Sequence, residues 1–139
     1  MTGGLFDDNK TIKLLGAGDF QEKENTFKLK SKRCHAVLFF ANWCGHCQNL
    51  KPAYNNFADM CQFIKVAAVD SEANSTLMEN INKTAKIRGN KVQIQGFPTI
   101  WFYKNCEPML EYQGERTPEK LKDVAMKICN EKCKCHEYK

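Results

Sequence analysis

Two cysteines stand three positions apart where a buried strand is expected to give way to a helix. Residues 36–41, Ala-Val-Leu-Phe-Phe-Ala, are continuously apolar, which is typical of a strand covered on both faces. From about Cys44 to Met60 the apolar residues recur at three- and four-residue spacing, which predicts an amphipathic helix. Cys44 and Cys47 therefore fall at the start of that helix. This junction restricts the chain to folds in which a core strand leads directly into a helix.

The rest of the chain continues the alternation of strands and helices. Further strands are expected at 11–15, 63–69, 99–103 and 109–112, and further helices at Asp19, near Leu77 and at Thr117–Pro118. In the helix expected from Asp19, Glu22 would complete a capping box, and Phe20, Phe27 and Leu29 would be the apolar residues. The order βαβαβ followed by ββα predicts an α/β fold, with a central mixed sheet and helices on both faces.

Length and composition indicate one ordered domain. The 139 residues suit a single domain, and 42% hydrophobic with 27% charged residues excludes a disordered chain. No apolar run approaches 18 residues, so no membrane span is expected. The net charge of +5 is a modest excess that does not favour nucleic acid as a partner. We divide the chain into an N-terminal extension (1–10), a domain (11–130) with a long loop at about 82–93, and a cysteine-rich basic tail (131–139).

The pair at Cys44 and Cys47 has the spacing of a redox-active dithiol. A helix N-terminus presents unpaired N–H groups and a positive partial charge, which favour thiolate over thiol at Cys44. Cys44 is thus the expected nucleophile and Cys47 the resolving thiol, with His46 as a cationic or hydrogen-bonding neighbour. Zinc would need a second ligand pair. The only other cluster is formed by Cys129, Cys133, Cys135 and His136, so no metal or cofactor is expected.

Several motifs give the chain a family resemblance over roughly residues 11 to 130. Trp43-Cys44-Gly45-His46-Cys47 is similar to the active-site motif of protein disulfide isomerase catalytic domains, which belong to the thioredoxin superfamily. The agreement extends to segments 48–54 (Gln-Asn-Leu-Lys-Pro-Ala-Tyr), 66–70 (Val-Ala-Ala-Val-Asp), 96–99 (Gly-Phe-Pro-Thr) and 112–116 (Tyr-Gln-Gly-Glu-Arg). The resemblance implies a single thioredoxin-fold domain and thiol–disulfide exchange on cysteine-containing protein or peptide substrates. The redox partner, a thiol oxidase or reductase, is left open.

The resemblance also implies roles for residues outside the dithiol. Pro98 corresponds to a cis-proline beside the cysteines, where the Phe97 backbone would pair with an extended substrate. Trp43, Phe97 and Pro98 would form a shallow apolar surface for substrate, although core packing also explains the two aromatic residues. Arg116 occupies the place of a mobile arginine that can approach Cys47 and favour its thiolate. An ordinary solvated arginine is the alternative.

Two positions depart from the family pattern. Leu38 stands where the family has a buried carboxylate that accepts the proton of the resolving cysteine, and Ala68 replaces the lysine that pairs with it. Losing both members of a buried ion pair is tolerated far better than losing one. We therefore expect slower deprotonation of Cys47, which would depend on water, on the substrate thiolate or on His35.

The long loop and the remaining cysteines leave alternatives open. Lys83, Lys86, Arg88 and Lys91 lie in the loop, either as a solvated surface or as a patch that faces a partner. Cys34 and Cys61 are expected to be buried and inert, and Cys106 to be exposed in a hairpin turn. Cys129, Cys133, Cys135 and His136 could bind a soft metal, form a disulfide within the tail or cross-link two chains. We favour a reduced, mobile terminus.

A second functional class and a compartment follow from the same features. The alternative to an enzyme is a redox-competent scaffold or interaction protein that uses the cysteine tail or the basic loop. The sequence shows neither a signal peptide nor a retention signal, so we expect synthesis in a reducing compartment, where structural disulfides are rare. Domains of this kind without signals also occur in large cytoplasmic DNA viruses. Cytoplasm or virion is therefore favoured over the endoplasmic reticulum.

Overall fold

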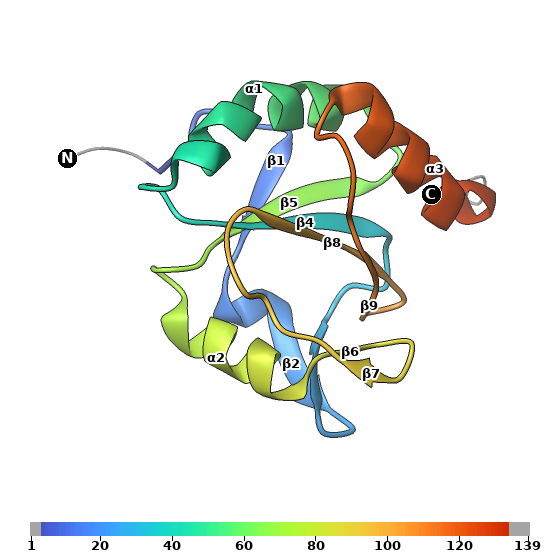
Figure 1. Cartoon of the computed structure of the whole chain (residues 1–139). Helices are drawn as coiled ribbons and strands as arrows, with labels where there is room; N and C mark the ends of the chain where they lie inside the picture. Colours follow the sequence, from blue (N-terminus) through green and yellow to red (C-terminus); the bar gives the residue numbers. More distant parts are fainter. Residues whose placement is uncertain (1–3, 134–139) are drawn as a thin grey trace.

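A five-stranded mixed sheet forms the centre of the molecule. The computed structural model describes residues 4–133, and the side chains of residues 4–129 (Figure 1). In spatial order the strands are β1 (Ile12–Leu15), β5 (Lys65–Asp70), β4 (His35–Phe40), β8 (Thr99–Lys104) and β9 (Glu107–Glu111). The first three are parallel, while β8 and β9 run antiparallel to their neighbours. This arrangement confirms the predicted mixed sheet.

Helices cover both faces of this sheet. Figure 1 shows α1 (Gly45–Met60) and α3 (Pro118–Cys133) on one face and α2 (Ser75–Thr84) on the other. All six residues of β4 are buried, because Leu38 packs on the side of α1 and Phe39 packs on the side of α2. Burial on both faces explains why this strand has no alternation of apolar and polar residues. The junction between β4 and α1, which contains Cys44, lies at one end of the sheet.

The prediction of a helix beginning at Asp19 is wrong. The segment forms a short 3-10 turn, η1 (Ala17–Asp19), and a hairpin of β2 (Phe20–Lys23) and β3 (Thr26–Leu29). Phe20 and Leu29 are buried register partners in that hairpin, so they meet across the turn instead of along a helix face. The carboxylate of Asp19 accepts the Gly16 N–H at 2.9 Å, and Glu22 lies in β2.

The segment at about 82–93 is also more regular than expected. After α2 the chain forms a second small hairpin, β6 (Lys86–Ile87) and β7 (Asn90–Lys91). The connecting residues Arg88 and Gly89 have φ angles of 54° and 83°, which suit a tight hairpin turn. Part of the loop predicted at about 82–93 is therefore a two-stranded hairpin.

A disulfide joins the strand that precedes the redox motif to the last helix. Cys34, which comes directly before β4, is bonded to Cys129 on α3 across a sequence separation of 95 residues. Cys129 is fully buried and Cys34 is half-buried. The predictions of an inert Cys34 and of a reduced Cys129 are therefore wrong, and the domain contains a disulfide although structural disulfides are rare in the expected compartment. Cys61 is buried, as predicted, and Cys106 is half-buried rather than exposed. Cys135 and His136 lie outside the described residues.

Candidate active site

Cys44 is the N-cap of α1. Its backbone is extended, with φ −76° and ψ 117°, because the chain is leaving the end of β4. The Cys44 Sγ accepts a hydrogen bond from the Cys47 N–H at 3.2 Å. A sulfur in this position receives an N–H donor that has no partner within the helix, together with the positive end of the helix dipole. The local geometry therefore favours negative charge on Cys44.

The second neighbour of Cys44 is the backbone that precedes Pro98. The Cys44 thiol donates to the Phe97 carbonyl oxygen, with 3.6 Å between sulfur and oxygen. The peptide bond between Phe97 and Pro98 is cis, as the family resemblance implied, and Pro98 is buried. The structure thus brings together Cys44 and a cis-proline that are more than fifty residues apart in sequence.

An exposed aromatic surface borders the sulfur of Cys44. Trp43 is 63% exposed, and its ring meets the half-buried Phe97 ring edge to face, with 6.3 Å between centroids. Core packing therefore does not explain Trp43. The indole N–H of Trp43 donates to the carboxylate of Glu72, which follows β5. Sequence reasoning missed Glu72 because nothing in the sequence pairs an exposed glutamate with a tryptophan 29 residues earlier.

Cys47 lies deeper in the core than Cys44, although both side chains are buried in the same apolar cluster. Its side chain is fully buried. The pKa of Cys47 is raised to about 12, chiefly by burial and then by a hydrogen bond with Cys44, while the Ala41 backbone and the Arg116 charge act to lower it. The two sulfurs of the motif thus have different neighbours: that of Cys44 lies at the helix N-terminus beside the Phe97 carbonyl, and that of Cys47 lies deeper in the core.

Both departures from the family pattern lie in the core next to Cys47. Leu38 and Ala68 are fully buried in the same apolar cluster as Cys47 and are register partners between β4 and β5. No carboxylate stands at either position. Burial without such a group accounts for the direction of the pKa shift at Cys47.

His35 is not a neighbour of Cys47. It is the first residue of β4, whereas Cys47 follows the other end of that strand. With a rise of about 3.3 Å per residue, a six-residue strand separates its ends by roughly 17 Å. The prediction that His35 could accept the proton of Cys47 is therefore wrong. His46 and Gly45 are exposed in the first turn of α1, and Arg116 is exposed before α3.

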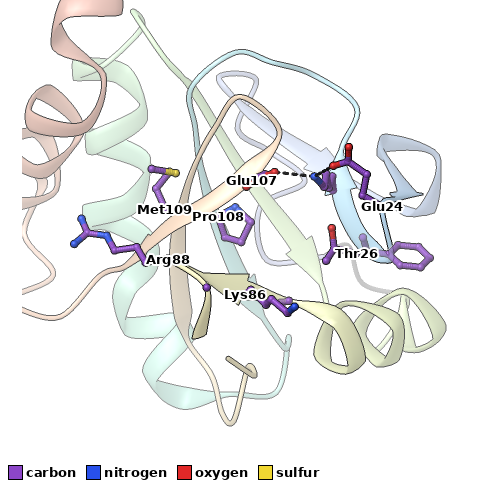
Figure 2. Close-up of a pocket in the computed structure, with 11 residues that line it drawn as sticks. Glu24, Thr26, Lys86, Arg88, Glu107, Pro108 and Met109 are labelled. Carbon is purple, nitrogen blue, oxygen red and sulfur yellow. Dashed lines mark hydrogen bonds and ion pairs between the residues drawn. The ribbon is translucent and has the colours of Figure 1, made fainter. Parts of the chain in front are cut away.

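The basic loop contributes to a second cavity that is lined by no residue of the redox motif. Figure 2 shows Lys86, Arg88 and Met109 at this cavity of about 380 Å³, which lies between the β2–β3, β6–β7 and β8–β9 hairpins. Its most buried charge, Lys28, is held by the carboxylates of Glu24 at 3.0 Å and Glu107 at 2.7 Å. The charge of Lys28 is thus neutralised within the cavity wall.

The described part of the chain contains neither a cluster of metal ligands nor a membrane-spanning helix. No three His, Cys, Asp or Glu side chains among the described residues are grouped so as to hold a metal ion. Over the same residues, no helix combines the length and apolar character that crossing a bilayer requires.

Comparison with known proteins agrees with this geometry. The thioredoxin family model matches residues 17–127. The chain belongs to the thioredoxin family. Within it, this domain is 30% identical over 127 residues to protein disulfide-isomerase like 2-2 of Arabidopsis thaliana, covering 88% of the chain and 26% of that protein. It is 32% identical over 125 residues to human protein disulfide-isomerase A6, covering 88% of the chain and 25% of that protein.

Solved structures confirm the thioredoxin fold of the domain. The J-Trx1 fragment of ERdj5 matches with a TM-score of 0.68 and 20% identity, over 91% of this chain and 55% of that one. The thioredoxin of Fasciola hepatica matches with a TM-score of 0.52 and 26% identity, over 70% of this chain and 82% of that one. The thioredoxin-family domain spans about a quarter of the length of the curated relatives it matches.

Proposed function

We propose that this domain catalyses thiol–disulfide exchange on cysteine-containing proteins or peptides, with Cys44 attacking and Cys47 resolving. One observation carries the proposal: the Cys44 sulfur caps α1 through the Cys47 N–H at 3.2 Å and also lies 3.6 Å from the Phe97 carbonyl before the cis Pro98. A sulfur at a helix N-terminus is activated as a nucleophile, and although Cys44 is only 5% exposed, it lies beside the Phe97 backbone along which an extended chain could dock.

The reaction conserves electrons at each step. The Cys44 thiolate attacks one sulfur of a substrate disulfide, forming a mixed disulfide and releasing the other substrate sulfur as a thiolate. Cys47 loses its proton and attacks Cys44, which closes the Cys44–Cys47 disulfide and releases the reduced substrate. The reverse sequence oxidises a substrate dithiol. Isomerisation results when a second thiolate of the same substrate attacks the mixed disulfide before Cys47 does.

The aromatic surface supports the substrate class. Trp43 and Phe97 together offer apolar area beside Cys44 without a deep pocket, which suits unfolded segments of varied sequence. The Phe97 carbonyl lies 3.6 Å from the sulfur and can accept a hydrogen bond from a substrate N–H. Proteins with exposed cysteines are thus the proposed substrates. A compartment in the cytoplasm or a virion stays a prediction.

Reactivation of scrambled ribonuclease tests the proposal. We expect wild type to restore ribonuclease activity and Cys44→Ser/Cys47→Ser to be inactive, with thermal unfolding confirming that the double variant folds. Cys106→Ser is the matched control, because Cys106 is a half-buried cysteine outside the motif. Equal activity of wild type and the double variant would show that the domain binds substrates without exchanging their disulfides, as a scaffold would.

The redox potential of the Cys44–Cys47 pair separates the directions of the reaction. A value near about −180 mV suits an oxidase or isomerase, and a value near about −270 mV suits a reductant. Equilibration with glutathione buffers, followed by alkylation and mass spectrometry, assigns the value to this pair separately from Cys34–Cys129.

A further inference from the structure

A cationic cavity lies at the end of the sheet remote from the redox motif. It measures about 210 Å³ and is lined by residues that include Lys13, Lys30, Lys65, His35 and Asp19. These residues come from β1, β4, β5, the η1 region and the segment after β3, and His35 begins the strand whose other end leads to Cys44. The cavity is therefore separate from the proposed active site.

The strand register explains why the charges converge. Lys65 is the direct register partner of His35 between β5 and β4. Lys13 and Leu15 share one face of β1, because strand side chains alternate. The three ammonium groups have no ion-pair partner among the described residues, whereas the carboxylate of Asp19 accepts the Gly16 N–H. The cavity is thus lined by three lysines without an ion-pair partner among the described residues. The Asp19 carboxylate, which also lines it, is already hydrogen-bonded.

His35 gives the cavity a buried polar wall. The side chain is 4% exposed, and its Nδ1–H donates to the Arg33 carbonyl at 2.8 Å, which leaves Nε2 as the remaining polar atom of the ring. Burial lowers the pKa of His35, the Arg33 and Lys65 charges lower it further, and the Arg33 hydrogen bond and Asp19 raise it. The ring is consequently neutral near pH 7 and can gain a proton when an anion offsets the lysine charges.

A second cationic cavity of about 200 Å³ adjoins the first. It shares Lys65 and is also lined by Lys10 and Arg33, with no acidic residue in its lining. Positive charge therefore extends on both sides of Lys65. Clustered cations at a concave surface raise the local concentration of anions.

We propose that the cavity at Lys13, Lys30, Lys65 and His35 binds a tetrahedral oxyanion, either a free ion or the phosphate group of a small ligand. The three ammonium groups neutralise the anion, and protonated His35 donates from Nε2 while Nδ1–H stays on the Arg33 carbonyl. Binding takes up a proton at His35, so affinity should increase as the pH falls toward the pKa of the free histidine.

Calorimetric titration of the full chain with sulfate at low ionic strength tests the site. Sulfate stays a dianion across pH 5.5–8, so a change of affinity with pH reports on the protein. We expect saturable binding that tightens toward acidic pH. Lys13→Met and Lys65→Met should each weaken binding roughly tenfold, because each removes a charged hydrogen-bond donor. Lys86→Met, which removes an equal charge outside this cavity, should leave the affinity unchanged.

Spectroscopy of wild type provides a measurement that does not depend on a folded variant. Sulfate should raise the pKa of His35 in an NMR titration of the ring protons, and the exposed His46 should shift much less. The titration is repeated with inorganic phosphate and with glycerol phosphate. Equal affinities for these two ligands assign the site to a free anion, and tighter binding of glycerol phosphate assigns it to a phosphate-bearing ligand. Non-saturable binding, equal weakening by Lys86→Met or an unmoved His35 would each overturn the proposal.

Discussion

Leu38 lies directly opposite Ala68 in the parallel β4–β5 ladder, and both are fully buried in the cluster that contains Cys47. The resolving thiol of this domain is thus covered by hydrocarbon at the two positions where the family places an ion pair. A thiol in such surroundings is difficult to deprotonate, because the charged form loses its hydration. The chemistry of the second half-reaction depends on this arrangement.

Restoring a carboxylate at Leu38 should accelerate the resolving step. We expect Leu38→Glu/Ala68→Lys to speed the conversion of the mixed disulfide by roughly tenfold or more, because a positioned base accepts the proton of Cys47. The lysine accompanies the glutamate because an unpaired buried charge costs several kcal/mol of stability. The rate is measured by rapid acid quench in a single turnover. Leu38→Gln/Ala68→Met, which places no charge in the core, is the control, and an unchanged rate in the glutamate variant would contradict the prediction.

The resolving step should also depend steeply on pH. With the pKa of Cys47 raised to about 12 by burial, the thiolate fraction at neutral pH is very small and grows about tenfold with each pH unit. The single-turnover rate should therefore rise about tenfold per unit between pH 6 and pH 9 without reaching a plateau. Formation of the mixed disulfide by Cys44, measured in Cys47→Ser, provides the comparison. A plateau of the resolving rate near pH 8 would show that Cys47 has another proton acceptor.

Arg116 should contribute modestly to the same step. Its positive charge lowers the pKa of Cys47, against the larger effects of burial and of Cys44. Because Arg116 is exposed, solvent screens this charge, and we expect Arg116→Gln to slow resolution by roughly two- to fivefold at low ionic strength. Arg116→Lys should retain most of the rate. Added salt should reduce the difference between wild type and Arg116→Gln, and a difference that salt leaves intact would indicate a role other than charge.

The Cys34–Cys129 disulfide should make a large contribution to stability. A cross-link that closes a loop of about 95 residues lowers the entropy of the unfolded chain by an amount worth about 4 to 5 kcal/mol. We expect Cys34→Ser/Cys129→Ser to lose a free energy of unfolding of this order in urea titrations. Cys106→Ser should unfold like wild type. Equal midpoints and slopes for the double variant and wild type would show that the bond adds nothing to stability.

Much of the fold followed from the sequence where local pattern and burial agree. The apolar run at 36–41 predicts a buried strand, and the helical spacing of apolar residues from Cys44 predicts a helix directly after it. Strand, helix and the cysteine pair between them were therefore predicted together. The prediction of a helix over the segment from Phe20 to Leu29 failed because each strand has only four residues, of which one is buried. In so short a segment the positions of three apolar residues fit a helix as well as a hairpin. The turn residues Glu24 and Asn25, with φ angles of 56° and 67°, determine the outcome.

The long-range parts of the site could not be derived from local pattern. The bond between Cys34 and Cys129 joins residues that no spacing rule connects, since disulfide connectivity is not determined by sequence alone. The contact of Trp43 with Glu72 depends on how the loop after β5 meets the start of α1. Pro98, in contrast, was placed beside Cys44 by family resemblance, and the structure confirms that position.

The position of the disulfide also determines how the domain responds to mechanical load. The bond links Cys34, before β4, to Cys129, near the end of α3, so the dithiol, the cis-proline and four strands of the central sheet lie inside one covalent ring. A force that pulls the two ends of the chain apart passes from residue 34 to residue 129 through the sulfur atoms. Tension can unfold β1 and the β2–β3 hairpin, while the segment that contains Cys44 and Cys47 stays off the line of force.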